Sequence, residues 1–210
     1  MRRIYAVGDI HGCYDKFSAL LKEIPIDWSL DQIIILGDFI DRGPEPKRVV
    51  ELLLDLKFDH PDAFTVLMGN HERMFLNYLE APDENSNYLL FGGQTTVDDY
   101  TSISKGLSVP ESHLRFLQSL PLMELTEKFC FVHAGLRPGI PIQEQKDEDL
   151  LLIRNDFIRS KYDWGRRVIF GHTPFDQPLL MENKIGIDTG AVYGGRLTCL
   201  ILPDVDFIFV

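Results

Sequence analysis

Two acids and an arginine lie close together in the stretch Leu36-Gly37-Asp38-Phe39-Ile40-Asp41-Arg42-Gly43, directly after the apolar run Ile33-Ile34-Ile35. The apolar run predicts a buried strand, so the charged residues begin where the strand ends. In open α/β sheets, ligands bind outside the carboxyl ends of the strands. Asp and Gly also form ordinary turns, so this stretch indicates a site only if other strands end in the same way.

Five apolar runs end in side chains that can bind a metal or carry a proton. These side chains are Asp9 and His11, Asp38 and Asp41, Asn70 and His71, His133, and His172. For a single histidine, a hydrogen-bonded structural role is the more common explanation. Several buried ionisable groups at one sheet edge are costly without a common partner. The set therefore favours a divalent metal, for which histidine, aspartate and an asparagine carbonyl are suitable ligands.

The number of candidate ligands indicates two ions rather than one. Three or four ligands suffice for one ion, whereas the chain offers Asp9, His11, Asp38, Asn70, His133 and His172. We therefore expect two divalent ions, with Asp38 as the bridging ligand. Two ions about 3.5–4 Å apart can hold the attacking and leaving oxygens of an in-line displacement. On the zinc precedent they lower the pKa of a shared water from about 15.7 to about 7, which predicts a hydroxide nucleophile.

The elements that must position these residues alternate between strand and helix over the first part of the chain. Strands are predicted over 3–7, 32–36 and 64–68, and helices over 14–24 and 46–58. A third helix is expected after Arg73, through Met74, Phe75 and Leu79. Pro25 stops the first helix, and Pro46 stands in the first turn of the second. This alternation predicts an α/β fold with parallel strands and right-handed crossovers.

The rest of the chain predicts shorter elements and one domain over residues 1–210. We expect a loop over 81–88, a loop with a short helix over 91–109, helices over 110–120 and 150–158, a hairpin of 122–125 with 129–132, a strand over 167–170, and short antiparallel strands over 179–181, 184–187, 197–202 and 207–210. These expectations rest on breaker-rich segments and on helical or strand periodicity. The sequence contains neither an internal repeat nor a convincing linker, which favours a single domain.

Composition narrows the functional classes. Hydrophobic residues make up 45% and charged residues 25% of the 210 residues, which is typical of a globular protein. The net charge of −11 argues against a nucleic-acid partner, and no apolar run is long enough to cross a bilayer. Cys13, Cys130 and Cys199 do not form a disulfide framework, which favours the cytoplasm. Cys13 follows a polar cluster, and packing is preferred for it over redox sensitivity. His60 and His113 are expected at the surface.

Five motifs follow one another between residues 8 and 172. They are Gly8-Asp9-Ile10-His11-Gly12, Gly37-Asp38-Phe39-Ile40-Asp41-Arg42-Gly43, Gly69-Asn70-His71-Glu72, His133-Ala134-Gly135 and Gly171-His172. In this order they resemble the metallophosphoesterases of the phosphoprotein phosphatase, or calcineurin-like, type. Leu152-Ile153-Arg154 and Gly171-His172-Thr173-Pro174 are similar to the bacterial and phage serine/threonine phosphatases in particular. The resemblance implies a sandwich of two mixed β-sheets flanked by helices, with a dimetal site at the strand C-terminal ends.

The resemblance also implies a role for each matching residue. Asp9 and His11 would hold the first metal, Asp38 would bridge, and Asn70, His133 and His172 would hold the second. Arg42 and Arg154 would bind the phosphate oxygens, for which a planar guanidinium is well suited. His71 would be the general acid that protonates the leaving oxygen, held in orientation by Asp41.

Structural alternatives stand beside these roles. Arg42 could form a salt bridge with a neighbouring acid, Arg154 could be an ordinary surface arginine on a helix, and His71 could be a metal ligand. Asp188-Thr189-Gly190 is interpreted as a structural turn under the site, and Phe91-Gly92-Gly93 is expected to border the substrate cleft.

Three functions are compatible with these motifs. The sequence favours a metal-dependent phosphomonoesterase, a serine/threonine protein phosphatase that acts on phosphorylated proteins or peptides. The alternative is a symmetrical dinucleoside tetraphosphate hydrolase, with nucleotide polyphosphates as substrates. A non-catalytic metal-binding scaffold ranks below both, because every ligand position is filled. Mixed nitrogen and oxygen sites accept manganese, iron, zinc or cobalt, and manganese is expected from the resemblance. The oligomeric state stays open.

Overall fold

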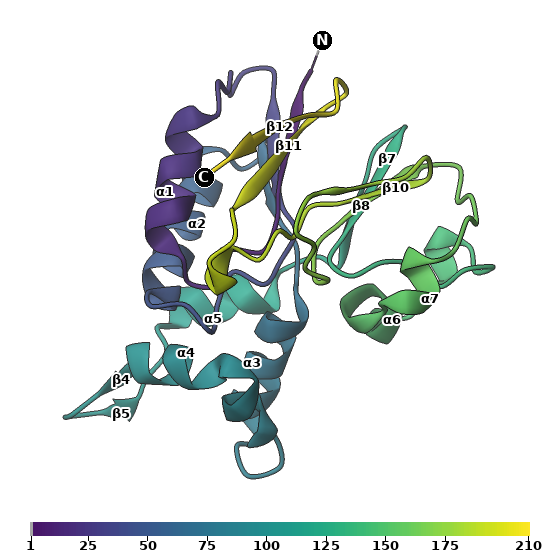
Figure 1. The fold of residues 1–210 in the computed structure, drawn as a ribbon. Helices are drawn as coiled ribbons and strands as arrows, with labels where there is room; N and C mark the ends of the chain where they lie inside the picture. The colour runs from purple at the N-terminus through teal and green to yellow at the C-terminus, as the bar shows by residue number, and fades with distance from the viewer. Residues whose placement is uncertain (1) are drawn as a thin grey trace.

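Two five-stranded mixed β-sheets pack face to face in the computed structural model, which describes residues 2–210 (Figure 1). The first sheet has the strand order β12-β11-β1-β2-β3, and the second has the order β6-β7-β8-β10-β9. The strands of the first sheet are β1 (Ile4–Val7), β2 (Gln32–Ile35), β3 (Phe64–Val66), β11 (Thr198–Leu202) and β12 (Asp206–Phe209). Those of the second are β6 (Met123–Leu125), β7 (Phe129–Val132), β8 (Arg167–Phe170), β9 (Leu179–Leu180) and β10 (Lys184–Gly186). The predicted two-sheet α/β architecture is confirmed.

Three neighbouring parallel strands in each sheet determine where the strand ends meet. In the first sheet, β1, β2 and β3 run parallel, with Val7 paired to Ile35 and Ile35 paired to Val66. In the second sheet, β7, β8 and β10 run parallel. The remaining strands, β6, β9, β11 and β12, pair antiparallel with their neighbours. Because parallel strands end at the same edge of a sheet, each sheet gathers its predicted site residues at one edge.

Alternating side chains along each strand supply both faces of a sheet with core residues. Ile4 and Ala6 of β1 face the second sheet and share a buried cluster with Phe131. Tyr5 and Val7 point the other way, into the cluster beneath the helices of the first sheet. Strands buried on both faces read as continuous apolar runs, which is why β1 and β2 stand out in the sequence.

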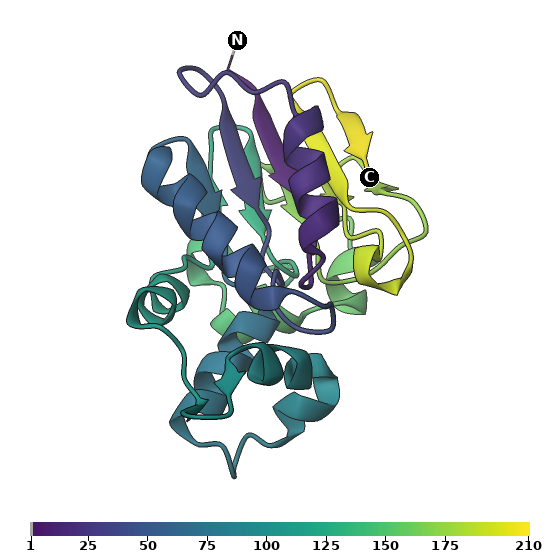
Figure 2. The ribbon, with the colours of Figure 1, turned by 90° about the vertical axis from the view of Figure 1, so that its left-hand side faces the viewer.

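The helices lie outside the two sheets. They are α1 (Tyr14–Glu23), α2 (Pro46–Asp59), α3 (Asn70–Glu80), α4 (Gln94–Asp99), α5 (Glu111–Gln118), α6 (Asp147–Leu152) and α7 (Asn155–Ile158), with short turns η1 (Leu89–Gly93), η2 (Ile142–Glu144) and η3 (Ala191–Tyr193). Figure 2 shows α1 and α2 lying across the outer face of the first sheet. The helices α6 and α7 lie beside the second sheet (Figure 1). None of the helices within residues 2–210 is long and apolar enough to cross a membrane.

Four expectations about local structure were wrong. The strand β10 pairs antiparallel with β9, as expected, but on its other side it pairs parallel with β8, because a crossover rather than a hairpin joins β8 and β10. The helix predicted over 150–158 is two helices, interrupted at Ile153 and Arg154. Residues 101–107 form the hairpin β4 (Thr101–Ser102) with β5 (Gly106–Leu107) instead of a loop. His113 is buried on α5, where its Nδ1 lies 2.8 Å from the Tyr100 hydroxyl, so it is not a surface residue.

Candidate active site

Residues from five strand ends come together at the junction of the two sheets. Asp9, Asp38 and Asn70 follow β1, β2 and β3, while His133 and His172 follow β7 and β8. All of them, with His11, Asp41 and His71, are buried polar residues. A set of buried ionisable groups at one edge is the arrangement that the sequence predicted.

Unusual backbone conformations are concentrated in this region. Six non-glycine residues among 2–210 have positive φ angles, and five of them are site residues: His11 (45°), Asp38 (47°), Asp41 (68°), Arg42 (65°) and His172 (63°). Such conformations cost free energy for residues with a Cβ, and they persist only where the surroundings enforce them. The strained backbone at the strand ends therefore indicates that the directions of these side chains matter.

Glu72 holds the loop that carries Asp38. It is fully buried at the third position of α3. Its carboxylate accepts hydrogen bonds from the backbone N–H groups of Asp38 (2.9 Å), Phe39 (2.9 Å), Ile40 (3.2 Å) and Gly69 (2.9 Å). A single side chain thus fixes both the loop after β2 and the start of α3.

Two histidines direct Nε2 towards Asp38. His11 Nδ1 donates to the Ile40 carbonyl oxygen at 2.8 Å, and His133 Nδ1 donates to the Leu36 carbonyl oxygen at 2.9 Å. These bonds orient each ring so that Nε2 faces the carboxylate, as in metal-ligating histidines. The Nε2 atoms of His11 and His133 lie 3.7 Å and 3.4 Å from the Asp38 carboxylate oxygens.

Two groups of metal-ligating atoms share Asp38. One comprises His11, Asp38 and His71, and the other comprises Asp38, His133 and His172. In the second, His133 Nε2 lies 3.0 Å from Asn70 Oδ1 and 3.2 Å from His172 Nδ1. Tetrahedral bonds of about 2.1 Å place neighbouring ligand atoms about 3.4 Å apart. The spacing therefore fits one ion in this group.

The chemistry of the donors supports the same conclusion. His133 Nε2, His172 Nδ1 and the oxygens of Asn70 and Asp38 all carry electron pairs, so they repel one another unless a cation lies between them. Within residues 2–210, no lysine or arginine pairs with Asp38, whose ion pairs are all with histidines. A divalent cation satisfies this donor set, and the shared Asp38 makes two adjacent cations possible.

Asp9 lies at the edge of the second group. Both of its carboxylate oxygens accept the backbone N–H of His172 at 3.1 Å. The buried Asp188 carboxylate lies nearby and accepts the Gly190 N–H at 2.9 Å, so the predicted turn over Asp188, Thr189 and Gly190 is present. Burial and the charge of Asp188 raise the pKa of Asp9. An ion bound by Asp9 would relieve this repulsion.

His71 and Asp41 form a buried pair beside the first group. His71 Nδ1 lies 2.6 Å from Asp41 Oδ2, and His71 Nε2 lies 3.9 Å from Asp38 Oδ2. The other oxygen of Asp41 accepts hydrogen bonds from the hydroxyls of Tyr88 (2.6 Å) and Thr96. The position of His71 Nε2 is compatible with a proton donor at the metal centre and also with a metal ligand.

Arg42 lies over the first group and is supported from two sides. Its guanidinium contacts His11 Nε2, and its backbone N–H donates to the Gly92 carbonyl oxygen at 3.0 Å. Gly92 has a φ of 104°, and a Cβ there would lie 2.5 Å from Arg42 Cγ. Only glycine fits this position without displacing Arg42. The η1 segment that contains Gly92 thus packs against Arg42 and helps to fix its position.

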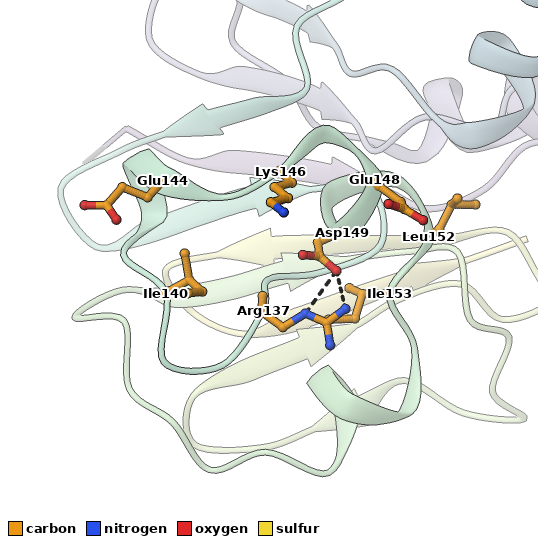
Figure 3. A pocket seen from close by; sticks show the side chains of 8 residues that line it. All are labelled: Arg137, Ile140, Glu144, Lys146, Glu148, Asp149, Leu152 and Ile153. Atoms are coloured by element: carbon orange, nitrogen blue, oxygen red, sulfur yellow. Dashed lines mark hydrogen bonds and ion pairs between the residues drawn. The ribbon is translucent and has the colours of Figure 1, made fainter.

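Arg154 reaches the site from the break between α6 and α7. Its Nη1 donates to the Thr173 hydroxyl at 3.3 Å, next to His172, and its side chain is exposed. The segment is anchored by Arg137, whose guanidinium pairs with Asp149 as drawn in Figure 3. A hollow of about 480 Å³ lies beside this ion pair, and none of the proposed metal ligands lines it. The predicted site residues therefore all lie at the same junction, with Arg154 at its exposed rim.

The sequence of the whole chain matches one protein family. The family of calcineurin-like phosphoesterases matches residues 2–209. The chain belongs to this family. Its members use a dimetal centre for phosphoester hydrolysis, in agreement with the two groups that share Asp38.

Curated relatives within the family include dinucleoside polyphosphate hydrolases. The chain is 29% identical to the asymmetrical bis(5'-nucleosyl)-tetraphosphatase PrpE of Bacillus thuringiensis (strain Al Hakam), over 97% of this chain and 92% of the relative. It is 27% identical to the protein of the same name from Geobacillus sp. (strain WCH70), over 99% of this chain and 94% of the relative.

Solved structures agree on the calcineurin-like fold. A protein provisionally assigned as a diadenosine tetraphosphatase superposes with a TM-score of 0.76 at 24% identity, covering 99% of this chain and 92% of that chain. A serine/threonine phosphatase from Saccharomyces cerevisiae superposes with a TM-score of 0.64 at 16% identity, covering 99% and 78%. The fold of this phosphoesterase is thus shared by proteins named for different substrates.

Protonation at the phosphoesterase centre follows from burial and from Asp38. Burial lowers the pKa of His11 to about 3, so its ring is neutral and ready to bind a metal. For His133, burial acts to lower the pKa, but the carboxylates of Asp38 and Asp9 outweigh it and raise the pKa to about 9. In the absence of an ion, a proton on His133 separates the facing electron pairs.

Three functional residues received no role from the sequence, and a fourth, Asp188, was assigned only to a structural turn. Glu72, Tyr88, Thr96 and the carboxylate of Asp188 became apparent only in the folded chain. Glu72 could have been found, because a glutamate at the third position of a helix commonly accepts the N-cap amide. Tyr88 and Thr96 lie about fifty residues from Asp41 in a segment without regular periodicity, and no local signal connects them to it.

Proposed function

We propose that this protein is a dimetal hydrolase of nucleoside polyphosphates, with dinucleoside tetraphosphates as its substrate class. The observation that supports the hydrolytic chemistry is the position of Asp38 between two groups of metal-ligating atoms. The substrate class is supported by the relatives named as asymmetrical dinucleoside tetraphosphatases, which match this chain over nearly its full length.

In this proposal Asp9, His11 and Asp38 would hold one divalent ion, and Asp38, Asn70, His133 and His172 would hold a second. We propose manganese for both, because a mixed set of imidazole, carboxylate and amide ligands accepts it. When bound, the ions supply Lewis-acid activation of the phosphate and of water.

Arg42 and Arg154 bind the phosphate chain from opposite sides. The Arg42 guanidinium is next to His11, and the Arg154 guanidinium is next to Thr173 and His172. Their donors can bind two oxygens of one phosphate each, which holds the substrate in line for attack. Arg42 makes no ion pair with a carboxylate among the described residues, so its charge is available to the substrate.

His71 delivers a proton to the leaving oxygen, and Asp41 orients it. The Asp41 carboxylate accepts from His71 Nδ1, which directs Nε2 towards the metal centre. A polyphosphate leaving group is stable as an anion and needs little help from this proton, whereas a serine or threonine alkoxide needs much more.

The His71–Asp41 pair therefore favours a second candidate, the serine/threonine protein phosphatase that the sequence alone suggested. A buried, oriented proton donor is of most use when the leaving group is an alkoxide.

The free thiols of Cys13, Cys130 and Cys199 are compatible with a reducing compartment. For either activity we propose a cytoplasmic location.

Side-by-side kinetics separate the two candidates. The manganese-loaded protein is assayed on diadenosine tetraphosphate and on a phosphothreonine peptide, with a metal-free sample as control. The proposal expects kcat/KM for the dinucleotide to be at least about tenfold the value for the peptide. Chromatography of the products distinguishes asymmetrical cleavage, giving ATP and AMP, from symmetrical cleavage, giving two ADP. A preference for the peptide would transfer the proposal to the protein phosphatase.

A further inference from the structure

An exposed tyrosine stands beside the arginine that is proposed to bind phosphate. Tyr193, at the end of η3, is 64% exposed. Its ring centre lies 5.7 Å from the Arg42 guanidinium carbon. A small group attached to a phosphate on Arg42 could therefore reach the exposed ring of Tyr193.

The turn that carries Tyr193 is held rigidly. Lys16 of α1 donates to the carbonyl oxygens of Ala191 (2.8 Å) and Gly195 (2.6 Å). The Thr189 hydroxyl donates to the Arg196 carbonyl oxygen at 2.6 Å, and a Cβ on Gly195 would lie 2.1 Å from the Thr189 carbonyl oxygen. An exposed ring on a backbone held in this way is suited to binding, because little backbone conformational entropy is lost when a ligand contacts it.

A hollow lies beside Tyr193. It has a volume of about 380 Å³ and is lined by Pro174, Phe175, Asp176, Thr189, Gly190, Tyr193, Gly195 and Arg196. Pro174 stands two positions after the proposed metal ligand His172 in the chain. The Arg196 guanidinium lies 4.0 Å from the centre of the Phe209 ring and donates to the Gln177 side-chain oxygen at 2.8 Å.

The combination of aromatic walls, a fixed cation and a neighbouring phosphate site matches one kind of ligand. We propose that this hollow binds the nucleobase of the substrate, stacked on Tyr193, while the phosphate attached to the same nucleoside lies on Arg42. This inference rests on the proposed function and adds the part of the site that distinguishes a nucleotide from an inorganic phosphate. Stacking of a base on an aromatic side chain tolerates all bases, so the subsite accepts purines and pyrimidines alike.

The short distance from Tyr193 to Arg42 also orients the substrate. The phosphate at the metal centre is the one bonded directly to the stacked nucleoside, because a longer chain would carry the attacked phosphorus past Arg42. Water then loses a proton to the solvent and adds to this phosphorus, the bond to the next bridging oxygen breaks, and the electron pair leaves on the remaining polyphosphate, which takes a proton from His71 that the solvent replaces. The nucleoside monophosphate takes the new oxygen.

Binding measurements test the subsite without relying on turnover. The probes are AMP and ribose 5-phosphate, which differ only by the base, titrated into the manganese-loaded protein. We expect AMP to bind about tenfold or more tightly than ribose 5-phosphate, and Tyr193→Ala to remove this difference. Tyr193→Phe keeps the ring and should keep the difference. Phe58→Ala is the matched control, because Phe58 is an exposed ring (86%) near the end of α2.

The outcomes separate this inference from the proposed function. Equal affinity of the wild-type protein for AMP and ribose 5-phosphate, or a preference that survives Tyr193→Ala, overturns the subsite even if diadenosine tetraphosphate is hydrolysed. A base preference that depends on Tyr193 supports the subsite even if a phosphopeptide proves to be the better substrate. Tighter binding of a phosphotyrosine peptide than of AMP, lost in Tyr193→Ala, would reassign the hollow to a peptide side chain.

Hydrolysis in ¹⁸O-labelled water tests the orientation. The wild-type protein should place the label in AMP when it cleaves diadenosine tetraphosphate, whereas label in ATP or ADP would contradict the orientation. Tyr193→Ala should lower kcat/KM for the dinucleotide about tenfold or more and leave that for inorganic tripolyphosphate, which lacks a base, within about twofold. A parallel loss on both substrates would contradict base stacking.

Discussion

Asp41 receives hydrogen bonds from three side chains, and each constrains what its carboxylate can do for His71. One oxygen accepts from His71, and the other accepts from Tyr88 and Thr96. Asp41 is fully buried, so these bonds are not exchanged for bonds to water. A carboxylate held in this way fixes the direction of the imidazole more strictly than a solvated one could.

Three substitutions separate metal binding from proton transfer. Asp38→Asn should lower the bound metal to less than half, because Asp38 belongs to both ligand groups. Asp41→Asn and His71→Asn should retain the metal and lower kcat on a phosphothreonine peptide about 10²–10⁴-fold, the usual contribution of a general acid. Metal content by mass spectrometry and kcat are measured for each variant. Loss of metal from His71→Asn equal to that from Asp38→Asn would make His71 a ligand instead.

Tyr88→Phe tests how much the orientation of Asp41 matters. The ring should remain packed on Phe75, 5.8 Å away, while Asp41 loses one hydrogen bond. The carboxylate then orients the His71 ring less strictly. On a phosphothreonine peptide kcat should fall several-fold, and the metal content should be unchanged. Tyr78→Phe, which changes a ring 5.3 Å from Tyr88, is the control and should leave kcat unchanged.

At the scale of elements, the site depends on contacts between segments that are distant in sequence. Glu72 of α3 holds the loop after β2, and Gly92 of η1 supports Arg42 in the same loop. Burial and the nearby Asp38 charge raise the pKa of Glu72 to about 7, while the bond from the Ile40 N–H opposes the rise. The ionised form is the one that can accept all four backbone amides.

Glu72→Gln should destabilise this loop. An amide has only one acceptor oxygen, so its NH₂ group would face the backbone N–H groups that now bind the second carboxylate oxygen. Leaving two buried amides without acceptors costs about 2–6 kcal/mol. Urea denaturation should show a loss of this order, and metal retention should fall because Asp38 is displaced. Glu80→Gln at the exposed end of α3 is the control, and an equally stable Glu72→Gln variant would contradict the role.

The sequence contained the information for β1, β2, β3 and the residues that follow them, since buried parallel strands are continuous apolar runs with an abrupt polar end. It did not contain the pairing of β10 with β8, because a strand of three residues has no periodicity that distinguishes parallel from antiparallel neighbours. Arg154 was placed on a continuous helix for a similar reason. The break at Ile153 is imposed by packing between α6 and the second sheet, where Ile153 is buried.

At the scale of the whole molecule, the ligand groups connect the two sheets. His133 of the second sheet donates to the Leu36 carbonyl of the first, and Asp9 of the first sheet accepts from the His172 amide of the second. An ion shared between Asp38 and His133 would add a further connection. The two sheets should therefore unfold together as one cooperative unit, which is what a single domain over residues 1–210 requires.

The affinity for metal should rise with pH, because His133 must lose a proton before it can bind an ion. Without metal, its raised pKa of about 9 means that His133 holds a proton at neutral pH, and this proton must leave before Nε2 can bind an ion. Each proton displaced makes the apparent affinity for Mn²⁺ up to about tenfold greater per pH unit below that pKa. Calorimetric titration between pH 6.5 and 8.5 should show this increase, with protons released.

Bound metal should also stabilise both sheets together. Mn²⁺ at about 100 times its Kd should stabilise the fold by about 2.7 kcal/mol, and the single unfolding transition should move as a whole. An affinity independent of pH, or two transitions of which only one responds to Mn²⁺, would contradict a cation site that joins both sheets through His133.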